Sequence, residues 1–389
     1  MEFTKLATIM HFEELRKQYL IIFHQIWAER CREAEFALKS EKENSPVEIK
    51  PIHYASNGVS VRINQIADNQ FKIFVPSGLF DRLHTLVYLL FSKNTIKNVK
   101  LVRSVTDIND YVPLIPERLR SIFGDFEIDF PTYSSDLVGK YCLALPNPIS
   151  VKFALDSAIN FVAAHEISHI TKGHFEIRDE LLKEGGIRYI HAHGASLGFT
   201  ELELLMGFEC NADNASAISL SKIFAEAAAT LKERKLDFEA AFLEGFLGIG
   251  LLFSILDWRF RSLDKRGEGY YPHPLVRWSL VTQTIEMCID EQWKEYVKFY
   301  SDEVGKRISH FLHGLYLSEI FNSDEGLKDT DLLSPIGQLN MPESEFNLSV
   351  LSEFVYSANE KSRRIDILKK GIDSRKTIRA AMLKMAEEA

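Results

Sequence analysis

Two histidines and the glutamate between them are the residues in this sequence that most clearly could do chemistry. His165 and His169 are four positions apart, so on an α-helix they project from the same side, one turn above the other. That spacing allows two imidazoles to bind one metal ion, typically zinc. Glu166 follows His165 directly and can take the proton of a metal-bound water, which is general-base chemistry. The pattern predicts metal-dependent hydrolysis.

The surroundings of Glu166 favour this interpretation over a chance pattern. Glu166 is the only acidic residue between Asp156 and Lys172, a stretch in which apolar residues recur at helical spacing. A lone carboxylate in a segment that becomes buried is costly unless it is paired or used. The alternative is a pair of core histidines beside an accidental glutamate.

A third ligand is expected from a later helix, because a catalytic zinc ion has three protein ligands and one open position. Glu209 and Asp213 are four apart and are surrounded by small residues, which let two helices approach closely. Glu209 is therefore the predicted third ligand. Asp213 is predicted to accept a hydrogen bond from the second nitrogen of a ligand histidine and so to fix its tautomer. Two solvated carboxylates on a helix surface are the alternative.

His174 is the chief rival as third ligand. It lies five residues after His169, directly behind Gly173. The metzincin arrangement places the glycine three residues, and the third histidine six residues, after the second histidine. The register therefore differs, and His174 stays an alternative ligand. His191 and His193 lie in a glycine-rich stretch and are interpreted as loop-surface residues or substrate contacts.

A donor for the oxyanion is expected near the metal, because amide hydrolysis places negative charge on the carbonyl oxygen. Residues 270–277 contain tyrosine, histidine and arginine around two prolines. His273 is the first candidate for this contact and Tyr271 the second. An ordinary turn with an exposed histidine is the alternative.

These elements together resemble the gluzincin metallopeptidases. The resemblance rests on His165-Glu166-Ile167-Ser168-His169, Glu209-Cys210-Asn211-Ala212-Asp213, and His273-Pro274 with Arg277 downstream. The middle element looks like the Glu-x-x-Ala-Asp element of the HtpX-type family, and the last looks like that family's late motif, with a shorter gap before the arginine. The chain lacks the membrane spans of HtpX, and the segment from Ala164 to Phe175 looks more like the Lit-type phage-exclusion peptidases.

The resemblance covers about residues 154–278, roughly a third of the chain. It implies a zincin-like core in which His165, His169 and Glu209 bind one zinc ion. It also implies that Asp213 is the orienting carboxylate and that His273 contacts the substrate or the oxyanion. Lit-type proteins cleave a cytosolic host protein on a phage signal, and the resemblance suggests such a role.

The elements that must position these residues are predicted to be mainly helical. Asp156 is the expected N-cap of the helix that carries the histidines, and Gly173 its terminating residue. Residues 41–51 read as a loop, 58–75 as a pair of strands and 137–145 as a further strand. Further helices are expected over residues 12–40, from the Pro76-Ser77-Gly78 segment to 92, from Thr200 onward, and over 239–257, 275–299 and 348–389.

The predicted fold class is α+β, mainly helical, with a small β-sheet. An N-terminal α/β region is expected over residues 1–150, a zincin-like catalytic region over 151–285 and an appended helical region over 286–389.

Composition limits the partners. The net charge of −9 argues against a nucleic-acid binder. The longest apolar run, residues 245–256, is shorter than the ~20 residues that span a bilayer, so no membrane span is expected. The N-terminus shows no signal-peptide pattern. The four cysteines show no metal-binding or redox spacing, which favours reduced thiols in a cytoplasmic protein.

The predicted function is a zinc metallopeptidase that hydrolyses a cytoplasmic protein or peptide substrate, with Glu166 as the general base. The alternative is a regulatory or toxin-like partner-binding protein, with anti-phage defence as its suggested role, whose zinc site is gated or structural. A weaker third hypothesis is a membrane-surface protease that uses the helix over residues 239–257.

Overall fold

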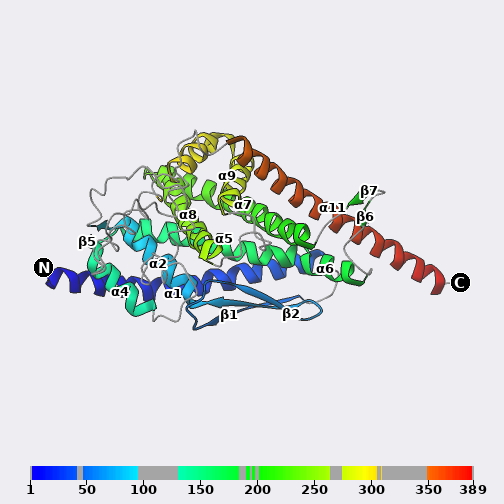
Figure 1. Cartoon of the computed structure of the whole chain (residues 1–389), viewed down its shortest axis with the longest axis horizontal. Helices are drawn as coiled ribbons and strands as arrows, with labels where there is room; N and C mark the ends of the chain where they lie inside the picture. The colour runs from blue at the N-terminus through cyan, green and yellow to red at the C-terminus, as the bar shows by residue number, and fades with distance from the viewer. Residues whose placement is uncertain are drawn as a thin grey trace.

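A long N-terminal helix lies along a small sheet. The computed structural model describes residues 2–41, 47–94, 130–183, 190–192, 195–197, 201–262, 274–304, 308 and 348–387. Helix α1 (Glu2–Glu41) packs against strand β1 (Glu48–Tyr54), as Figure 1 shows. The described part is mainly helical with one three-stranded sheet and two short strand pairs, which confirms the predicted α+β, mainly helical class.

The three-stranded sheet has the order β1-β3-β2. Strands β2 (Arg62–Ala67) and β3 (Gln70–Pro76) are antiparallel, which confirms the predicted pair, and β1 joins β3 in parallel. The predicted loop over residues 41–51 was wrong for its last part, because β1 begins at Glu48. Pro51 is tolerated there because β1 is an edge strand of this sheet.

Helix α2 (Ser77–Phe91) begins directly after Pro76, as predicted. The predicted strand over residues 137–145 was mostly wrong. Helix α4 (Phe130–Tyr141) occupies most of it, and only β5 (Cys142–Ala144), which pairs with β4 (Lys93–Asn94), is extended. The buried residues Leu137, Val138 and Tyr141 share one helical face, a spacing that also suits a short apolar strand run.

Helix α5 (Pro148–Thr171) carries both histidines of the motif. Its N-cap is Asn147, whose side chain accepts a hydrogen bond from the backbone N–H of Ile149, and Pro148 occupies the first turn. The predicted cap, Asp156, therefore lies inside the helix. The predicted end was right, because Gly173 adopts a left-handed φ of 70°. The chain then turns directly into α6 (His174–Lys183).

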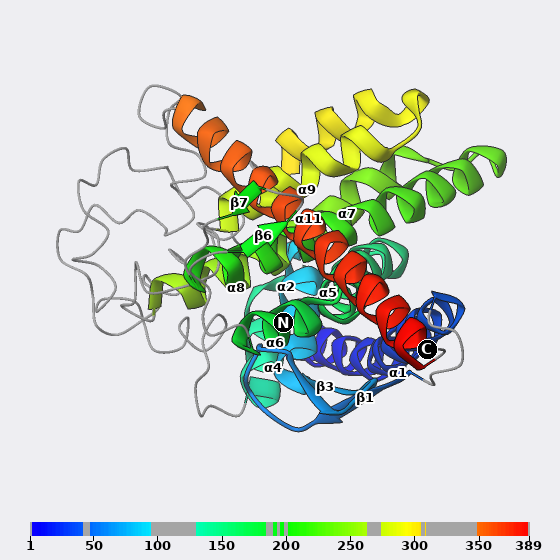
Figure 2. The same cartoon turned by 90° about the vertical axis from the view of Figure 1, so that its right-hand side faces the viewer.

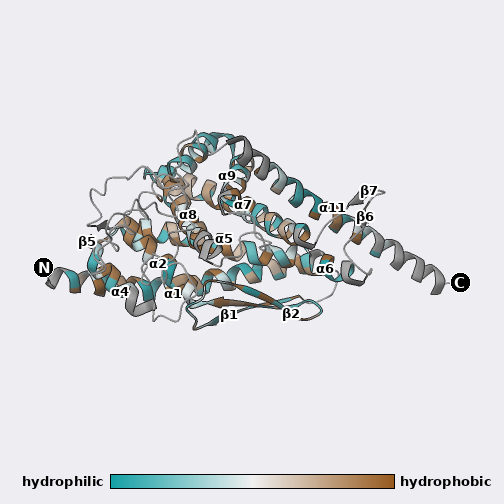
Figure 3. Ribbon diagram, in the orientation of Figure 1, coloured by the Kyte–Doolittle hydropathy of each residue, from teal (hydrophilic) through white to brown (hydrophobic). Residues whose placement is uncertain are grey.

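Two further helices pack against α5. They are α7 (Glu201–Glu233) and α8 (Glu239–Ser262). A Cβ at Gly248 of α8 would lie 1.9 Å from the carbonyl oxygen of Ala154, so the α5 and α8 backbones are in direct contact there. The apolar residues of α5 and α8 appear brown at the centre of the molecule (Figure 3). The predicted cap Thr200 lies outside the described residues.

Helix α9 (Pro274–Cys288) also packs on α7. The predicted helix over residues 275–299 is interrupted, because α9 ends at Cys288 and a 3-10 turn follows at Glu291–Trp293. A short strand pair, β6 (Ile190–Ala192) with β7 (Ala195–Leu197), completes the described sheets.

The C-terminal helix α11 (Leu348–Glu387) crosses the face formed by α6 and α7 (Figure 2). The main hydrophobic core draws buried residues from Phe12 to Ile308, whereas α11 contributes to two smaller clusters over α7. The expected boundaries at 150 and 285 fall inside α5 and α9. Among the described helices, none combines the length and apolar character needed to cross a membrane.

Candidate metal centre

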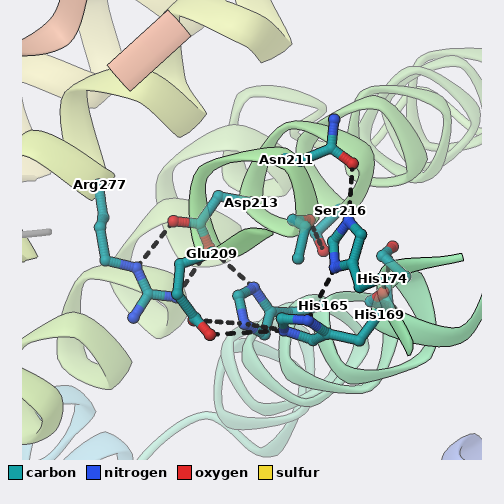
Figure 4. Close-up of polar contacts among 11 residues, drawn as sticks. His165, His169, His174, Glu209, Asn211, Asp213, Ser216 and Arg277 are labelled. Carbon is teal, nitrogen blue, oxygen red and sulfur yellow. Dashed lines mark hydrogen bonds and ion pairs between the residues drawn. The ribbon is translucent and has the colours of Figure 1, made fainter. Parts of the chain in front are cut away.

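Three side chains from two helices converge on one point. On α5, the Nε2 atoms of His165 and His169 lie 3.3 Å apart. From α7, Oε2 of Glu209 lies 3.2 Å from His165 Nε2, and its Oε1 lies 3.7 Å from His169 Nε2. Figure 4 shows the carboxylate facing both rings. Within the described residues, these three form a group that could hold a metal ion.

The spacing and the chemistry of the three groups suit a small divalent cation. A tetrahedral ion with metal–ligand distances of about 2.0 Å holds its ligand atoms roughly 3.3 Å apart, close to the distances between these atoms. Two imidazole nitrogens and one carboxylate oxygen are also ligands that zinc accepts. His165 and Glu209 are each only 6 % exposed, so the group is screened from solvent.

Asp213 supports this group from behind. Its Oδ1 lies 2.9 Å from His165 Nδ1, and Arg277 of α9 donates two hydrogen bonds to it, from Nε at 2.7 Å and from Nη2 at 2.8 Å. The carboxylate is 0 % exposed. Because Asp213 faces the Nδ1 of His165, the Nε2 that faces Glu209 is the nitrogen that could bind a metal once its proton is lost.

The charges in the site act strongly on one another. Burial disfavours a charged His165, but Asp213 and Glu209 raise its pKa to about 10. Burial lowers the pKa of His169 to about 4, so this ring is neutral near pH 7. Burial would raise the pKa of Asp213, yet Arg277 and His165 hold it at about 2. The two ligand rings therefore start from different protonation states, and metal binding to His165 releases a proton.

His174 lies outside the group of three. Its Nδ1 lies 2.9 Å from His169 Nδ1, and its Nε2 lies 3.0 Å from Oδ1 of Asn211 on α7. The ring is 3 % exposed and stacks on Phe208, with ring centroids 4.5 Å apart. Both nitrogens are thus engaged away from the point where the three side chains converge. The sequence left His174 as an alternative ligand, whereas in the structure it contacts His169.

Glu166 lies on α5 beside the histidines and is partly exposed. Burial, together with the nearby Glu209, raises the pKa of its carboxyl to about 7, against the opposing effect of His165 and Arg277. Such a carboxyl both accepts and releases protons near neutral pH, which is the property that a general base requires.

Several of the predicted site residues are not among the residues that the structure describes. His273, Tyr271 and His193 lie outside the described residues, and of His191 only its place in β6 is described. Two residues that contribute to the site were not recognised from the sequence. No role was assigned to Arg277, and Asn211 was noted only as part of a motif. A buried arginine needs a carboxylate partner, and this is the signal that could have paired Arg277 with Asp213.

Comparison with known proteins found no relative of this chain. No family model matches the chain, no curated protein matches its sequence, and no solved structure matches its fold. The site therefore stands on its own contacts.

Proposed function

We propose that this protein is a zinc-dependent peptidase with a zincin-like catalytic core. The observation that carries the proposal is the convergence of His165, His169 and Glu209 from two helices, with Glu166 adjacent on the same helix. Structural zinc sites usually have four protein ligands, whereas catalytic sites have three and one open position. The described residues provide three, which favours catalysis over a purely structural role.

Zinc bound here would act as a Lewis acid and lower the pKa of a bound water. Glu166 removes the proton from the attacking water as its oxygen bonds to the peptide carbonyl carbon. The same carboxyl then gives that proton to the nitrogen as the C–N bond breaks. His273, or else Tyr271, donates a hydrogen bond to the carbonyl oxygen while negative charge builds there.

The proposed substrate is a cytoplasmic protein or peptide. This part of the proposal follows from the resemblance to Lit-type peptidases, in which a host protein is cut on a phage signal. The deep burial of His165 and Glu209, each 6 % exposed, favours a second candidate as well. In that candidate the protein is a regulatory or toxin-like binder whose zinc site is gated.

The central test is Glu166→Gln, because it removes the base and keeps the shape of the side chain. The variant should retain zinc at the wild-type ratio, measured by plasma mass spectrometry, and lose about 10²–10⁴-fold in hydrolysis rate. Glu180→Gln, an acidic residue of α6 outside the site, is the matched control. Equal hydrolysis rates for Glu166→Gln and wild type would refute the mechanism.

Substrate capture separates the two candidates. The Glu166→Gln variant, used as bait in a cell extract, should hold a protein that the wild type cleaves. Capture of a partner that the wild type binds and never cleaves would favour the gated binder.

A further inference from the structure

A hydrogen-bond network leads from the metal centre to the C-terminal helix α11. His169 contacts His174, His174 contacts Asn211, and the amide nitrogen of Asn211 reaches Ser362 and Asp366 of α11. His174 and Asn211 are each 3 % exposed, and Ser362 is 4 % exposed. Polar groups this deeply buried need their hydrogen-bond partners, so the two ends of this network depend on one another.

The acceptors on α11 fix the orientation of the Asn211 side chain. Its Nδ2 lies 3.3 Å from the backbone oxygen of Ser362 and 3.2 Å from Oδ1 of Asp366. A carbonyl oxygen and a carboxylate oxygen can only accept hydrogen bonds. The NH₂ group must therefore face α11, and the amide oxygen must face His174.

This orientation determines the tautomers of two histidines. The oxygen of Asn211 can only accept, so Nε2 of His174 carries a proton and donates it. Neutral His174 then has its lone pair on Nδ1, and the contact with His169 Nδ1 requires that His169 donates. His169 consequently keeps the lone pair on Nε2, the atom that faces His165 and Glu209.

Helix α11 is held by contacts of its own, separate from the main core. Ile365, Leu368 and Ile372 pack with Leu204 and Phe208 of α7 in a distinct cluster. Ser362 also accepts a hydrogen bond from the side chain of Asn214, at 3.0 Å. The docking of helix α11 can therefore change without disrupting the core around α5.

A second contact joins α11 to the turn that places His174. Lys369 of α11 lies over Gly173, where an added Cβ would be 2.5 Å from Nζ, and it forms an ion pair of 2.6 Å with Glu176. The same turn follows the helix that carries His169. Helix α11 thus contacts both segments that hold the network in place.

We propose that α11 regulates the metal centre: when docked, it fixes His169 in its metal-binding tautomer through Asn211 and His174. This inference deepens the proposed function and rests on the metal site within it. When α11 is displaced, the NH₂ group of Asn211 loses its acceptors and the amide is free to turn. His169 then loses the partner that fixes its Nδ1 proton, and metal affinity falls. His174, Asn211 and Ser362 act as positioning residues.

The test is zinc affinity of the full-length protein, measured by competition with a chromophoric chelator. Removing an outer partner of a ligand histidine typically costs 10–100-fold in metal affinity. We expect a loss of about that size for His174→Phe, which keeps the stacking on Phe208. A smaller but measurable loss is expected for the double variant Ser362→Ala/Asp366→Ala, because the backbone oxygen of Ser362 still accepts a hydrogen bond from Asn211. Far-UV circular dichroism establishes that each variant is folded.

Charge reversal at the exposed Asp366 tests whether the orientation of the Asn211 amide controls zinc affinity. In Asp366→Lys an obligatory donor replaces the acceptor, so the amide oxygen of Asn211 is drawn toward α11. Zinc affinity should fall at least as far as in the double variant. Asp302→Lys makes the same charge change at an exposed position outside α11 and should bind zinc as the wild type does.

The outcomes distinguish this inference from the proposed function. Wild-type zinc affinity in both Ser362→Ala/Asp366→Ala and Asp366→Lys would overturn the inference and leave the metal site standing. An equal loss in Asp366→Lys and Asp302→Lys would also overturn it. If the wild-type protein itself binds no zinc, the proposed function fails, and this inference fails with it.

Discussion

Oδ1 of Asp213 lies 2.9 Å from Nδ1 of His165, while two hydrogen bonds from Arg277 hold the same carboxylate. Helices α5, α7 and α9 therefore meet at a single fully buried charge. This contact links the stability of the helix packing to the orientation of a candidate metal ligand, and it can be tested by stability measurements alone.

Breaking this buried pair should destabilise the protein strongly. Asp213→Asn removes the negative charge that accepts two hydrogen bonds from the buried guanidinium of Arg277. Breaking a buried ion pair from one side typically costs about 3–5 kcal/mol. Urea denaturation measures the free energy of unfolding. Glu291→Gln, which removes an exposed ion pair with Lys294, should cause no measurable change.

Replacing both partners provides the complementary check. Asp213→Leu combined with Arg277→Met removes both charges, and it should cost less than Asp213→Asn alone. A double variant that is less stable than the single one would show that the loss comes from packing and not from the broken ion pair.

Metal removal should lower the thermal stability of the wild-type protein. An ion that binds only the folded state at a concentration 100-fold above its Kd adds about 2.7 kcal/mol. Treatment with a chelator should therefore lower the Tm of the wild type and leave that of His169→Ala unchanged. His24→Ala, at an exposed position of α1, should respond to the chelator as the wild type does. An equal chelator response in His169→Ala would exclude His169 as a ligand.

Contact between the α5 and α8 backbones predicts a severe effect at Gly248. In Gly248→Ala the new Cβ meets the carbonyl oxygen of Ala154 at 1.9 Å, which forces the helices apart. Overpacking of this kind costs about 1–3 kcal/mol or more, and it exceeds the gain of about 1 kcal/mol in helix propensity.

Gly250→Ala is the matched comparison, because its nearest neighbour is the side-chain end of Ile308, which can move. Its loss in unfolding free energy should be smaller than that of Gly248→Ala. Equal losses would contradict the argument from backbone contact.

Acid should destabilise the protein through His84. The ring is 0 % exposed, neither nitrogen has a hydrogen-bond partner among the described residues, and burial lowers its pKa to about 3. Unfolded, the ring has its ordinary pKa of 6.5 and takes up a proton more readily. Above pH 6.5 the ring is neutral in both states and the free energy of unfolding does not depend on its titration. From pH 6.5 down to about pH 3, the free energy of unfolding falls by about 1.4 kcal/mol for each unit of pH.

His84→Phe removes this titration and keeps an aromatic ring beside Phe80 and Phe12. The slope of unfolding free energy between pH 6.5 and 5 should therefore be smaller in the variant than in the wild type. Identical slopes would show that His84 takes up a proton equally in the folded and the unfolded state, which would contradict the argument from its burial.

The sequence was sufficient for features set by short-range geometry. The spacing of His165 and His169 fixes their common face on any helix, and Gly173 marks the end of that helix because glycine readily adopts a positive φ. The strand pair β2–β3 is joined by a tight turn at Asn69, whose φ is 61°, and such local patterns can be recognised without the rest of the fold.

Features set by packing could not be predicted in the same way. Arg277 and Asp213 are 64 residues apart, and Asn211 and Ser362 are 151 apart. Whether such pairs meet depends on helix crossing angles that no local pattern specifies. His174 illustrates the limit, since its position near the motif was visible and the direction of its ring was not.

The fully buried Asp213–Arg277 pair also has a consequence for synthesis of the protein on the ribosome. A growing polypeptide can assemble His165, His169 and Glu209 only loosely before Arg277 has emerged, because the carboxylate that orients His165 still lacks its counter-charge. If the proposed function holds, the unfinished translation product has no peptidase activity. A nascent chain that is arrested before residue 277 should be inert.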